Sequence, residues 1–338
     1  MQLYIAGGVH EHGRNCFLIR SDEFNIMLDC GVNVNEEDIY PHLSKEDIIN
    51  TRYLFLSHSH KDHTGAIKWI IEQGFNGYII ASKETFKQIN LDYSKMVNIE
   101  EKRSLPIDYI YGKSGHCVGS VWYLITINNK KILYTGDYIE NTLVYKCDWI
   151  RNISADIAII DCAYGYNNAS YQQYCKTLET ITTKLSNNSI LFPVPKSGRG
   201  IELLKLFDKL NVNIFADDNF INSLNIDHWY NDAIFKHLVT KYTDQKGIIF
   251  ISDPQLLKEE SQRIANKVLE EKGHIILTGT IDENTYASKL IKENKMMQLR
   301  YPVHQNYDQF LFLTSSNNFK QSIAFHSASF EYPQTIEF

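Results

Sequence analysis

A cluster of metal-ligand side chains, HSHKDH at residues 58–63, constrains this chain more than any other feature of its sequence. It follows the apolar run TRYLFLS, which predicts a strand, and precedes TGAIKWIIEQG, whose isoleucines recur at helical spacing. Alternate residues of an extended segment point to the same side, so His58 and His60 can converge on one point. Asp62 and His63 lie on the turn into the helix and are free to aim elsewhere. The stretch therefore predicts two adjacent metal ions rather than a polar loop.

A binuclear centre needs further ligands, which we expect at the ends of other strands. His116 precedes an apolar strand, Asp137 ends the strand KKILYTGD, and His326 ends the last apolar segment. One carboxylate can give one oxygen to each ion, and we assign this bridging role to Asp137. The first ion would then be held by His58, His60 and His116, and the second by Asp62, His63 and His326. Imidazole-rich ligation favours two zinc ions, with manganese or iron as the alternatives.

Composition limits the class of protein. The chain has 338 residues with 43% hydrophobic residues, enough for one large or two ordinary domains around a sizeable core. Its apolar runs are too short for a membrane span, and its first residues lack the layout of a secretory signal, so we expect a cytoplasmic protein without a membrane segment.

The formal net charge of -6 excludes coating of nucleic acid through bulk charge. Two divalent ions, set against two aspartates and a hydroxide, would still leave one local positive charge, which matches one phosphodiester group.

The chain divides by pattern into two parts. Short strands with polar residues at their ends occupy the chain up to about residue 165. The strands SILFPV, NIFA, GIIFIS and HIILTG then alternate with helical stretches, which predicts a small parallel α/β unit. After about residue 303 the motif-bearing loops return. We therefore predict a discontinuous first domain, residues 1–165 and 303–338, with residues 166–302 inserted into it.

Taken together, HSHKDH, the later GH, the TGD and the C-terminal histidine resemble the metallo-β-lactamase fold, a four-layer αββα sandwich. More specifically, GGVHEHGRNCFLI, LDCG, DCAYG, VPKSGRGIELL, ILTGT and the pair His304 and His326 are similar to the β-CASP branch of nucleases. This branch includes ribonuclease J and the endonuclease of pre-mRNA 3′ processing. The resemblance implies an α/β fold, a metallo-β-lactamase domain with an inserted β-CASP-like domain, and the activity of a metal-dependent phosphodiesterase.

The resemblance also implies roles for two residues outside the ligand set. Asp161 in IIDCAYG matches the first acidic motif of the branch, and His304 in PVHQN matches the histidine that protonates the leaving oxygen. From its chemistry alone, Asp161 is a carboxylate that orients an imidazole, with a strand-end cap as the alternative. His304 is a proton donor, with an exposed loop histidine as the alternative. Together with Asp62 they form the predicted catalytic set.

A basic loop is the candidate for binding the substrate backbone. Lys196, Ser197 and Arg199 lie in VPKSGRG, directly before the helical run IELLKLF. Backbone amides at a helix start attract phosphate, and Arg199 can add a bidentate contact. The TGT turn at residues 278–280, without an arginine nearby in the sequence, is a weaker candidate, and a plain turn explains it equally well. His12 is a weak candidate for supporting a ligand.

The sequence thus predicts a binuclear zinc-dependent ribonuclease that hydrolyses RNA phosphodiester bonds in the cleft between its two domains. In the β-CASP branch a histidine at the position of His326 goes with RNA-directed members, so DNA is the less favoured substrate. The alternatives are a DNA nuclease of the same fold, a hydrolase of a small ester or thioester, and a catalytically silent subunit of an RNA-processing complex. A homodimer or a partner from a processing complex is expected, and endonuclease and exonuclease modes both stay open. Because only 12 residues follow His326, we expect the C-terminal module of larger relatives to be absent.

Overall fold

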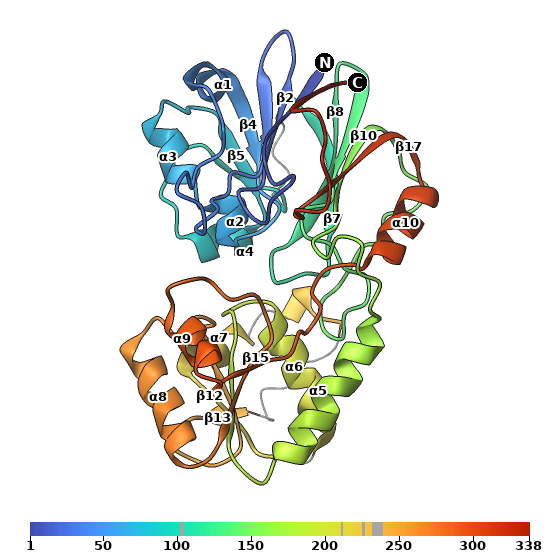
Figure 1. Cartoon of the computed structure of the whole chain (residues 1–338). Helices are drawn as coiled ribbons and strands as arrows, with labels where there is room; N and C mark the ends of the chain where they lie inside the picture. Colours follow the sequence, from blue (N-terminus) through green and yellow to red (C-terminus); the bar gives the residue numbers. More distant parts are fainter. Residues whose placement is uncertain (102–104, 211, 225–226, 232–238) are drawn as a thin grey trace. The chain divides into compact units, whose positions relative to one another are not determined.

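The structure is a computed structural model that describes residues 1–101, 105–210, 212–224, 227–231 and 239–338. The chain divides into two compact units, which Figure 1 shows. Unit 1 comprises Met1–Glu140, Cys147–Asn168 and His304–Phe338, and unit 2 comprises Asn141–Lys146 and Ala169–Val303. The segment Asn141–Lys146, which the sequence pattern assigns to the first domain, belongs to unit 2 instead. The reason is that the backbone amides of Leu143 and Val144 donate to the buried carboxylate of Glu202.

The first sheet of unit 1 has the strand order β18-β1-β2-β3-β4-β5-β6. Its strands are β1 (Gln2–Gly7), β2 (Cys16–Arg20), β3 (Asn25–Leu28), β4 (Thr51–Phe55), β5 (Tyr78–Ala81), β6 (Met96–Asn98) and β18 (Thr335–Glu337). The helices on its outer face are α1 (Lys45–Asn50), α2 (Lys61–Thr64), α3 (Ile67–Glu72) and α4 (Lys83–Ile89) (Figure 1). Strand residues such as Leu54 and Ile79 pack against Ile48 of α1 and Ile70 of α3 in one buried cluster. Because successive side chains of a strand point to opposite faces, the side chains on the other face of this sheet can pack against the second sheet.

The second sheet of unit 1 has the order β17-β10-β9-β8-β7. Its strands are β7 (Asp108–Lys113), β8 (Val121–Ile127), β9 (Lys130–Tyr134), β10 (Ser154–Asp161) and β17 (Asn318–Phe325). Helix α10 (Tyr307–Ser315) covers its outer face through Phe310 and Leu313, which pack with Leu133 and Ile160 (Figure 1). Strands β9, β10 and β17 run parallel. Their carboxyl ends therefore meet at one edge of the sheet.

The two sheets of unit 1 face each other across an aromatic layer. The ring of Phe17 in β2 lies 5.8 Å from that of Tyr134 in β9 and 5.2 Å from that of Phe325 in β17. The ring of Phe55 in β4 lies 5.1 Å from that of Tyr123 in β8. With α1–α4 outside one sheet and α10 outside the other, the layers are αββα (Figure 1). The predicted α/β sandwich is confirmed.

Unit 2 is built on a parallel sheet with the order β13-β12-β14-β11-β15-β16. Its strands are β11 (Ile190–Pro193), β12 (Ile214–Ala216), β13 (Val239–Lys241), β14 (Ile248–Ile251), β15 (His274–Leu277) and β16 (Met297–Gln298). Its helices are α5 (Tyr171–Leu185), α6 (Arg199–Phe207), α7 (Asp218–Ser223), α8 (Glu259–Glu270) and α9 (Tyr286–Lys292), with short 3₁₀ turns at Asp208–Leu210 and Asp227–Trp229.

Both faces of this parallel sheet are covered. Ile249 and Leu277 pack with Ile264 of α8 and Leu290 of α9. On the opposite face the ring of Phe250 stacks on Phe220 of α7, with the ring centroids 5.0 Å apart. Burial of both faces explains why these strands read as continuous apolar runs in the sequence. None of the helices in the described ranges combines the length and the apolar character needed to cross a membrane.

Candidate metal centre

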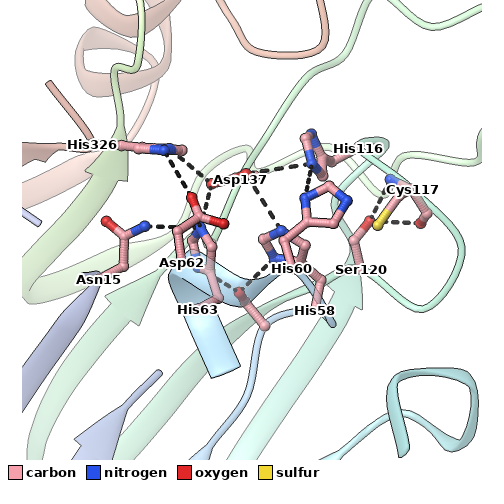
Figure 2. A network of polar contacts seen from close by, with 12 residues as sticks. Asn15, His58, His60, Asp62, His63, His116, Cys117, Ser120, Asp137 and His326 are labelled. Carbon is pink, nitrogen blue, oxygen red and sulfur yellow. Dashed lines mark hydrogen bonds and ion pairs between the residues drawn. The ribbon is translucent and has the colours of Figure 1, made fainter. Parts of the chain in front are cut away.

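The candidate ligands of unit 1 come from the carboxyl ends of strands. His58 and His60 follow β4, and Asp137 follows β9. His116 lies in the turn between β7 and β8, and His326 directly follows β17. Asp62 and His63 lie within the single turn of α2, for which His60 is the N-cap residue. All seven predicted ligands therefore belong to unit 1, and the fold brings them together (Figure 2).

The first group of potential ligands consists of His58, His60, His116 and Asp137, whose donor atoms all lie within 4.8 Å of one another. Oδ2 of Asp137 lies 3.4 Å from Nε2 of His58 and 3.3 Å from Nε2 of His116. Nε2 of His116 lies 3.2 Å from Nδ1 of His60. These are the residues that the sequence assigns to the first ion, together with the proposed bridge.

The second group consists of Asp62, His63 and His326, again with donor atoms within 4.8 Å of one another. Nε2 of His326 lies 3.1 Å from Oδ2 of Asp62. Oδ1 of Asp137 lies 3.1 Å from Nε2 of His63 and 3.2 Å from Nδ1 of His326. Asp137 thus directs one carboxylate oxygen to each group, as Figure 2 shows.

Buried atoms without hydrogen bonds test whether cations fit this centre. Three buried atoms in the described parts of the chain make no hydrogen bond: Nε2 of His58, Oδ1 of Asp137 and Nδ1 of His326. Each of them nevertheless lies close to another potential ligand atom of the centre. Nearly all buried polar atoms in proteins are hydrogen-bonded. Nitrogens and oxygens that converge without bonding one another suit divalent cations, and imidazole with carboxylate is a ligand set that zinc prefers.

Electrostatics favour positive charge beside the carboxylates. Burial and the neighbouring His63 lower the pKa of His58. Burial also opposes protonation of His326, but Asp137 and Asp62 outweigh it and raise the pKa of His326 to about 10. Burial opposes ionisation of Asp137, but His63 and His326 outweigh it and lower the pKa of Asp137. Divalent cations would replace the protons that these carboxylates attract.

Asp29 is a functional candidate that the sequence analysis missed. Its Oδ2 accepts hydrogen bonds from Nδ1 of His63 at 2.6 Å, from Oγ of Ser57 at 2.6 Å and from the hydroxyl of Tyr134 at 2.5 Å. Because an ionised carboxylate only accepts, it fixes the proton of His63 on Nδ1 and leaves Nε2 to face Asp137. The available signal was LDCG, in which a carboxylate ends an apolar strand.

Asp161 and His304 form a hydrogen-bonded pair beside the two groups. Nδ1 of His304 lies 2.8 Å from Oδ2 of Asp161, which also accepts from the amide of Tyr138 at 2.9 Å. Oδ1 of Asp161 accepts from the amide of Ala163 at 3.0 Å. Asp137, Asp161, His304 and His326 also form a third group whose donor atoms lie within 4.8 Å of one another. We favour a non-ligand role for Asp161, because three of the about four acceptor positions of its carboxylate already take hydrogen bonds.

Other predicted residues lie nearby or in unit 2. The ring of His12 lies 6.3 Å from that of His326. The ring of Tyr164, which was not predicted from the sequence, lies 5.4 Å from that of His304. Lys196, Ser197 and Arg199 belong to unit 2, where Lys196 is exposed and Arg199 begins α6. Nη1 of Arg199 donates to the carbonyl of Thr278 at 2.8 Å, so the TGT turn has an arginine beside it that is distant in the sequence.

The sequence model of the metallo-beta-lactamase superfamily matches residues 11–183, which is half of this chain, and the chain belongs to that superfamily. The matched segment includes His58, His60, Asp62, His63, His116, Asp137 and Asp161. His304 and His326 lie beyond it. The superfamily predicted from HSHKDH and TGD is therefore confirmed.

Two named relatives indicate the branch of the superfamily that this chain resembles. The chain is 25% identical to the endoribonuclease YSH1 of Candida albicans over 377 residues, which cover 86% of this chain and 43% of that protein. It is 27% identical to the probable RNase MJ4 of Methanocaldococcus jannaschii over 274 residues, which cover 69% of this chain and 64% of that protein. The chain spans about half the length of these relatives. They confirm the resemblance to the β-CASP nuclease branch.

A solved structure supports the fold. A protein of unknown function from Enterococcus faecalis V583 matches with a TM-score of 0.66, over 98% of this chain and 96% of that chain, at 12% identity. At this identity the likeness concerns the fold alone. The match extends over nearly the whole of both chains, so both units have a counterpart in that structure.

Proposed function

We propose that this chain is a binuclear zinc-dependent ribonuclease that hydrolyses RNA phosphodiester bonds at the centre in unit 1. One observation carries the proposal: Asp137 directs Oδ2 to His58 and His116, and Oδ1 to His63 and His326. A carboxylate placed between two groups of imidazoles suits a pair of cations that clamps a phosphodiester. The names of the two relatives, an endoribonuclease and an RNase, support RNA as the substrate.

A pair of zinc ions would supply Lewis acidity and an activated water at this centre. His58, His60, His116, Asp62, His63 and His326 would hold the ions, with Asp137 between them. Among the side chains that would hold the ions, only Asp62 and Asp137 subtract charge, because the others are imidazoles, and a hydroxide would subtract one charge more. The centre therefore keeps a local positive charge, which explains how a chain with a formal net charge of -6 can hold an RNA backbone.

His304 is the proposed proton donor to the departing ribose oxygen. Its Nδ1 is held by Asp161 at 2.8 Å, so Nε2 is the ring atom left to deliver the proton. Its side chain is 11% exposed, which allows substrate to reach it while the surrounding protein limits water. Asp161 acts through His304 by fixing the orientation of the ring.

Several predictions made from the sequence belong to this proposal. Lys196, Ser197 and Arg199 would contact the RNA backbone, and RNA would lie between the two domains. A cytoplasmic location and a homodimer or processing-complex partner remain predictions as well. Photocrosslinking of bound RNA that carries 4-thiouridine would test both the proposed backbone contacts and the proposed position of the RNA, because peptides from both units should carry the crosslink.

The direct test is incubation of the zinc-loaded protein with end-labelled RNA and with DNA of the same sequence. We expect cleavage of RNA, two zinc ions per chain, and loss of cleavage in Asp62→Ala. Circular RNA distinguishes an endonuclease, which cuts it, from an exonuclease, which does not. Cleavage of DNA alone would favour the DNA nuclease. Protein that binds no metal and cuts neither substrate would be the silent subunit.

A further inference from the structure

Glu11 and Arg14 form a largely buried ion pair that the proposed chemistry does not use. Nη2 of Arg14 lies 2.8 Å from Oε2 of Glu11, and Nε of Arg14 lies 3.1 Å from the same oxygen. The side chains of Arg14 and Glu11 are 9% and 17% exposed. They form part of the wall of a cavity of about 530 Å³. Desolvation makes such a pair costly unless its geometry and its other hydrogen bonds are good, so its further contacts show what it does for the fold.

Glu11 reaches the backbone that positions His326. Oε1 of Glu11 accepts a hydrogen bond from the amide of Gly8 at 3.0 Å. The carbonyl of Gly8 in turn accepts from the amide of His326 at 2.6 Å. His326 has a φ of 68°, a left-handed conformation that a residue with a side chain adopts only where its surroundings hold it. The contact with Gly8 is one of the restraints that hold His326 in this conformation.

Arg14 reaches the loop that holds α2, which carries Asp62 and His63. Nη1 of Arg14 donates to the carbonyl of Asp38 at 2.6 Å, and its backbone amide donates to the carbonyl of Val32 at 3.1 Å. The amide of Val32 bonds the carbonyl of Lys61 at 3.1 Å. Asn15, the residue after Arg14, contacts α2 directly. Its backbone amide donates to the carbonyl of Asp62 at 2.8 Å. Its side-chain Nδ2 lies 2.9 Å from Nε2 of His63 (Figure 2).

The packing of this loop against α2 leaves little room for adjustment. A Cβ added to Gly31 would lie 1.7 Å from the carbonyl oxygen of Asp62. The amide of Cys30 bonds the carbonyl of His63 at 2.8 Å. A shift of the loop would therefore move Asp62 and His63 with it. By contrast, His58, His116 and Asp137 follow β4, β7 and β9, and the hydrogen bonds described for Glu11 and Arg14 do not reach them.

We propose that the Glu11–Arg14 pair is a positioning device for the second cation, the one assigned to Asp62, His63 and His326, and that this site loses affinity when the pair is removed. The inference rests on the proposed function. The side chains of the pair hold residues 8–15 against the loop of residues 32–42. The backbone of these two segments bonds His326 on one side and α2 on the other. The first site should retain its cation.

The experiment titrates metal-free protein with Zn²⁺ by calorimetry, beside thermal unfolding of the same metal-free samples. The main variant is Glu11→Leu with Arg14→Met, because apolar residues of similar size often replace a buried ion pair without loss of stability. We expect one binding step to be unchanged and the other to weaken about 10-fold to 100-fold, the effect typical of lost outer-shell partners. The milder variant Arg14→Lys keeps the charge but not the fork of hydrogen bonds, and it should weaken the same step less.

The matched control is another bidentate pair of unit 1, Arg20 and Asp47, whose four atoms meet in two contacts of 2.9 Å. Arg20→Met with Asp47→Leu should lower the unfolding temperature and leave both zinc affinities unchanged. Zinc affinities in the Glu11 and Arg14 variants that stay within threefold of the wild type would overturn the inference and leave the proposed function standing. Equal weakening of both steps would also overturn it. Wild-type protein that takes up no zinc would overturn the proposed function and this inference with it.

Discussion

Nδ1 of His304 donates a hydrogen bond of 2.8 Å to Oδ2 of Asp161 and lies 3.9 Å from Oδ2 of Asp137. The same ring nitrogen thus faces both the carboxylate that orients the imidazole and, farther away, the carboxylate shared by both candidate ligand groups. In the proposed function, His304 would therefore move a proton without binding a cation, because the nitrogen that faces the carboxylates already bonds Asp161.

The first prediction concerns His304. His304→Ala should retain two zinc ions and lose about 10²-fold to 10⁴-fold in kcat, the range typical of a missing general acid. Cleavage of end-labelled RNA and metal analysis of the same sample measure both quantities. His10→Ala, at a surface histidine whose side chain is 63% exposed, is the control. Loss of zinc from His304→Ala would make His304 a ligand, in agreement with the third group of donor atoms.

The second prediction concerns the carboxylate behind His63. Asp29→Asn places an amide group where Oδ2 or Oδ1 accepts hydrogen bonds, so Nδ1 of His63 loses a fixed acceptor. We expect zinc to bind the second site about 10-fold to 100-fold more weakly. Calorimetric titration measures the change. Tyr134→Phe removes another hydrogen bond to the same carboxylate, and it should cost about 1 kcal/mol of stability without a comparable change in zinc affinity. Equal effects of the two substitutions would contradict the role given to Asp29.

The third prediction concerns acid stability. Burial alone would raise the pKa of Asp47, but hydrogen bonds from Arg20 and Ser44 outweigh it and lower the pKa below its ordinary value of 3.8. A lowered pKa in the folded state adds stability above the ordinary value, and this stability is lost as the pH falls through the folded pKa. Asp47→Asn should therefore cost about 1 to 2 kcal/mol at pH 7, because it also disrupts the capping box of α1.

The measurement is thermal unfolding of metal-free wild type and Asp47→Asn between pH 7 and pH 3. The difference between their midpoints should begin to shrink as the pH falls below about 4, where the carboxyl group of Asp47 becomes protonated in the unfolded chain first, and it should continue to shrink toward the lower pKa of the folded state. A difference that stays constant over this range would show that the ion pair with Arg20 does not contribute through its charge. Comparing the two proteins at each pH cancels the effect of the histidines, which titrate in both.

The fourth prediction concerns the basic loop of unit 2. Lys196→Ala should raise KM for RNA several-fold with kcat unchanged, because a phosphate contact holds substrate and transition state equally. The slope of log affinity against log salt should fall by about 0.7, the value for one phosphate contact on a single strand. Lys292→Ala, at an exposed lysine of the same unit, is the control and should change neither quantity. Equal changes in both variants would indicate an effect of net charge alone.

Much of the fold follows from local patterns in the sequence. The apolar run before HSHKDH forms β4, and the isoleucines after it form the buried face of α3. The apolar residues Tyr171, Leu178 and Leu185, which recur at helical spacing, lie in α5, where Leu178 is buried. The short helices α4 and α10 were not predicted. Helix α4 has few apolar residues, and the continuous apolar run FLFL of α10 does not show helical spacing. Both helices begin at capping side chains, Ser82 in α4 and Asn306 in α10.

The residue types and the spacing of HSHKDH, which are properties of the sequence, place imidazole and carboxylate candidates for metal ligation at the end of a strand. The division of these candidate ligands into two groups comes from the folded chain. The carboxyl ends of the parallel strands β9, β10 and β17 bring Asp137, Asp161 and His326 to one edge, where Asp137 turns one oxygen to each group. The physical reason is that local sterics fix the period of a segment, whereas the aim of a side chain depends on hydrogen bonds from distant parts of the chain. Asp29 behind His63 and Glu11 behind His326 are contacts of this kind.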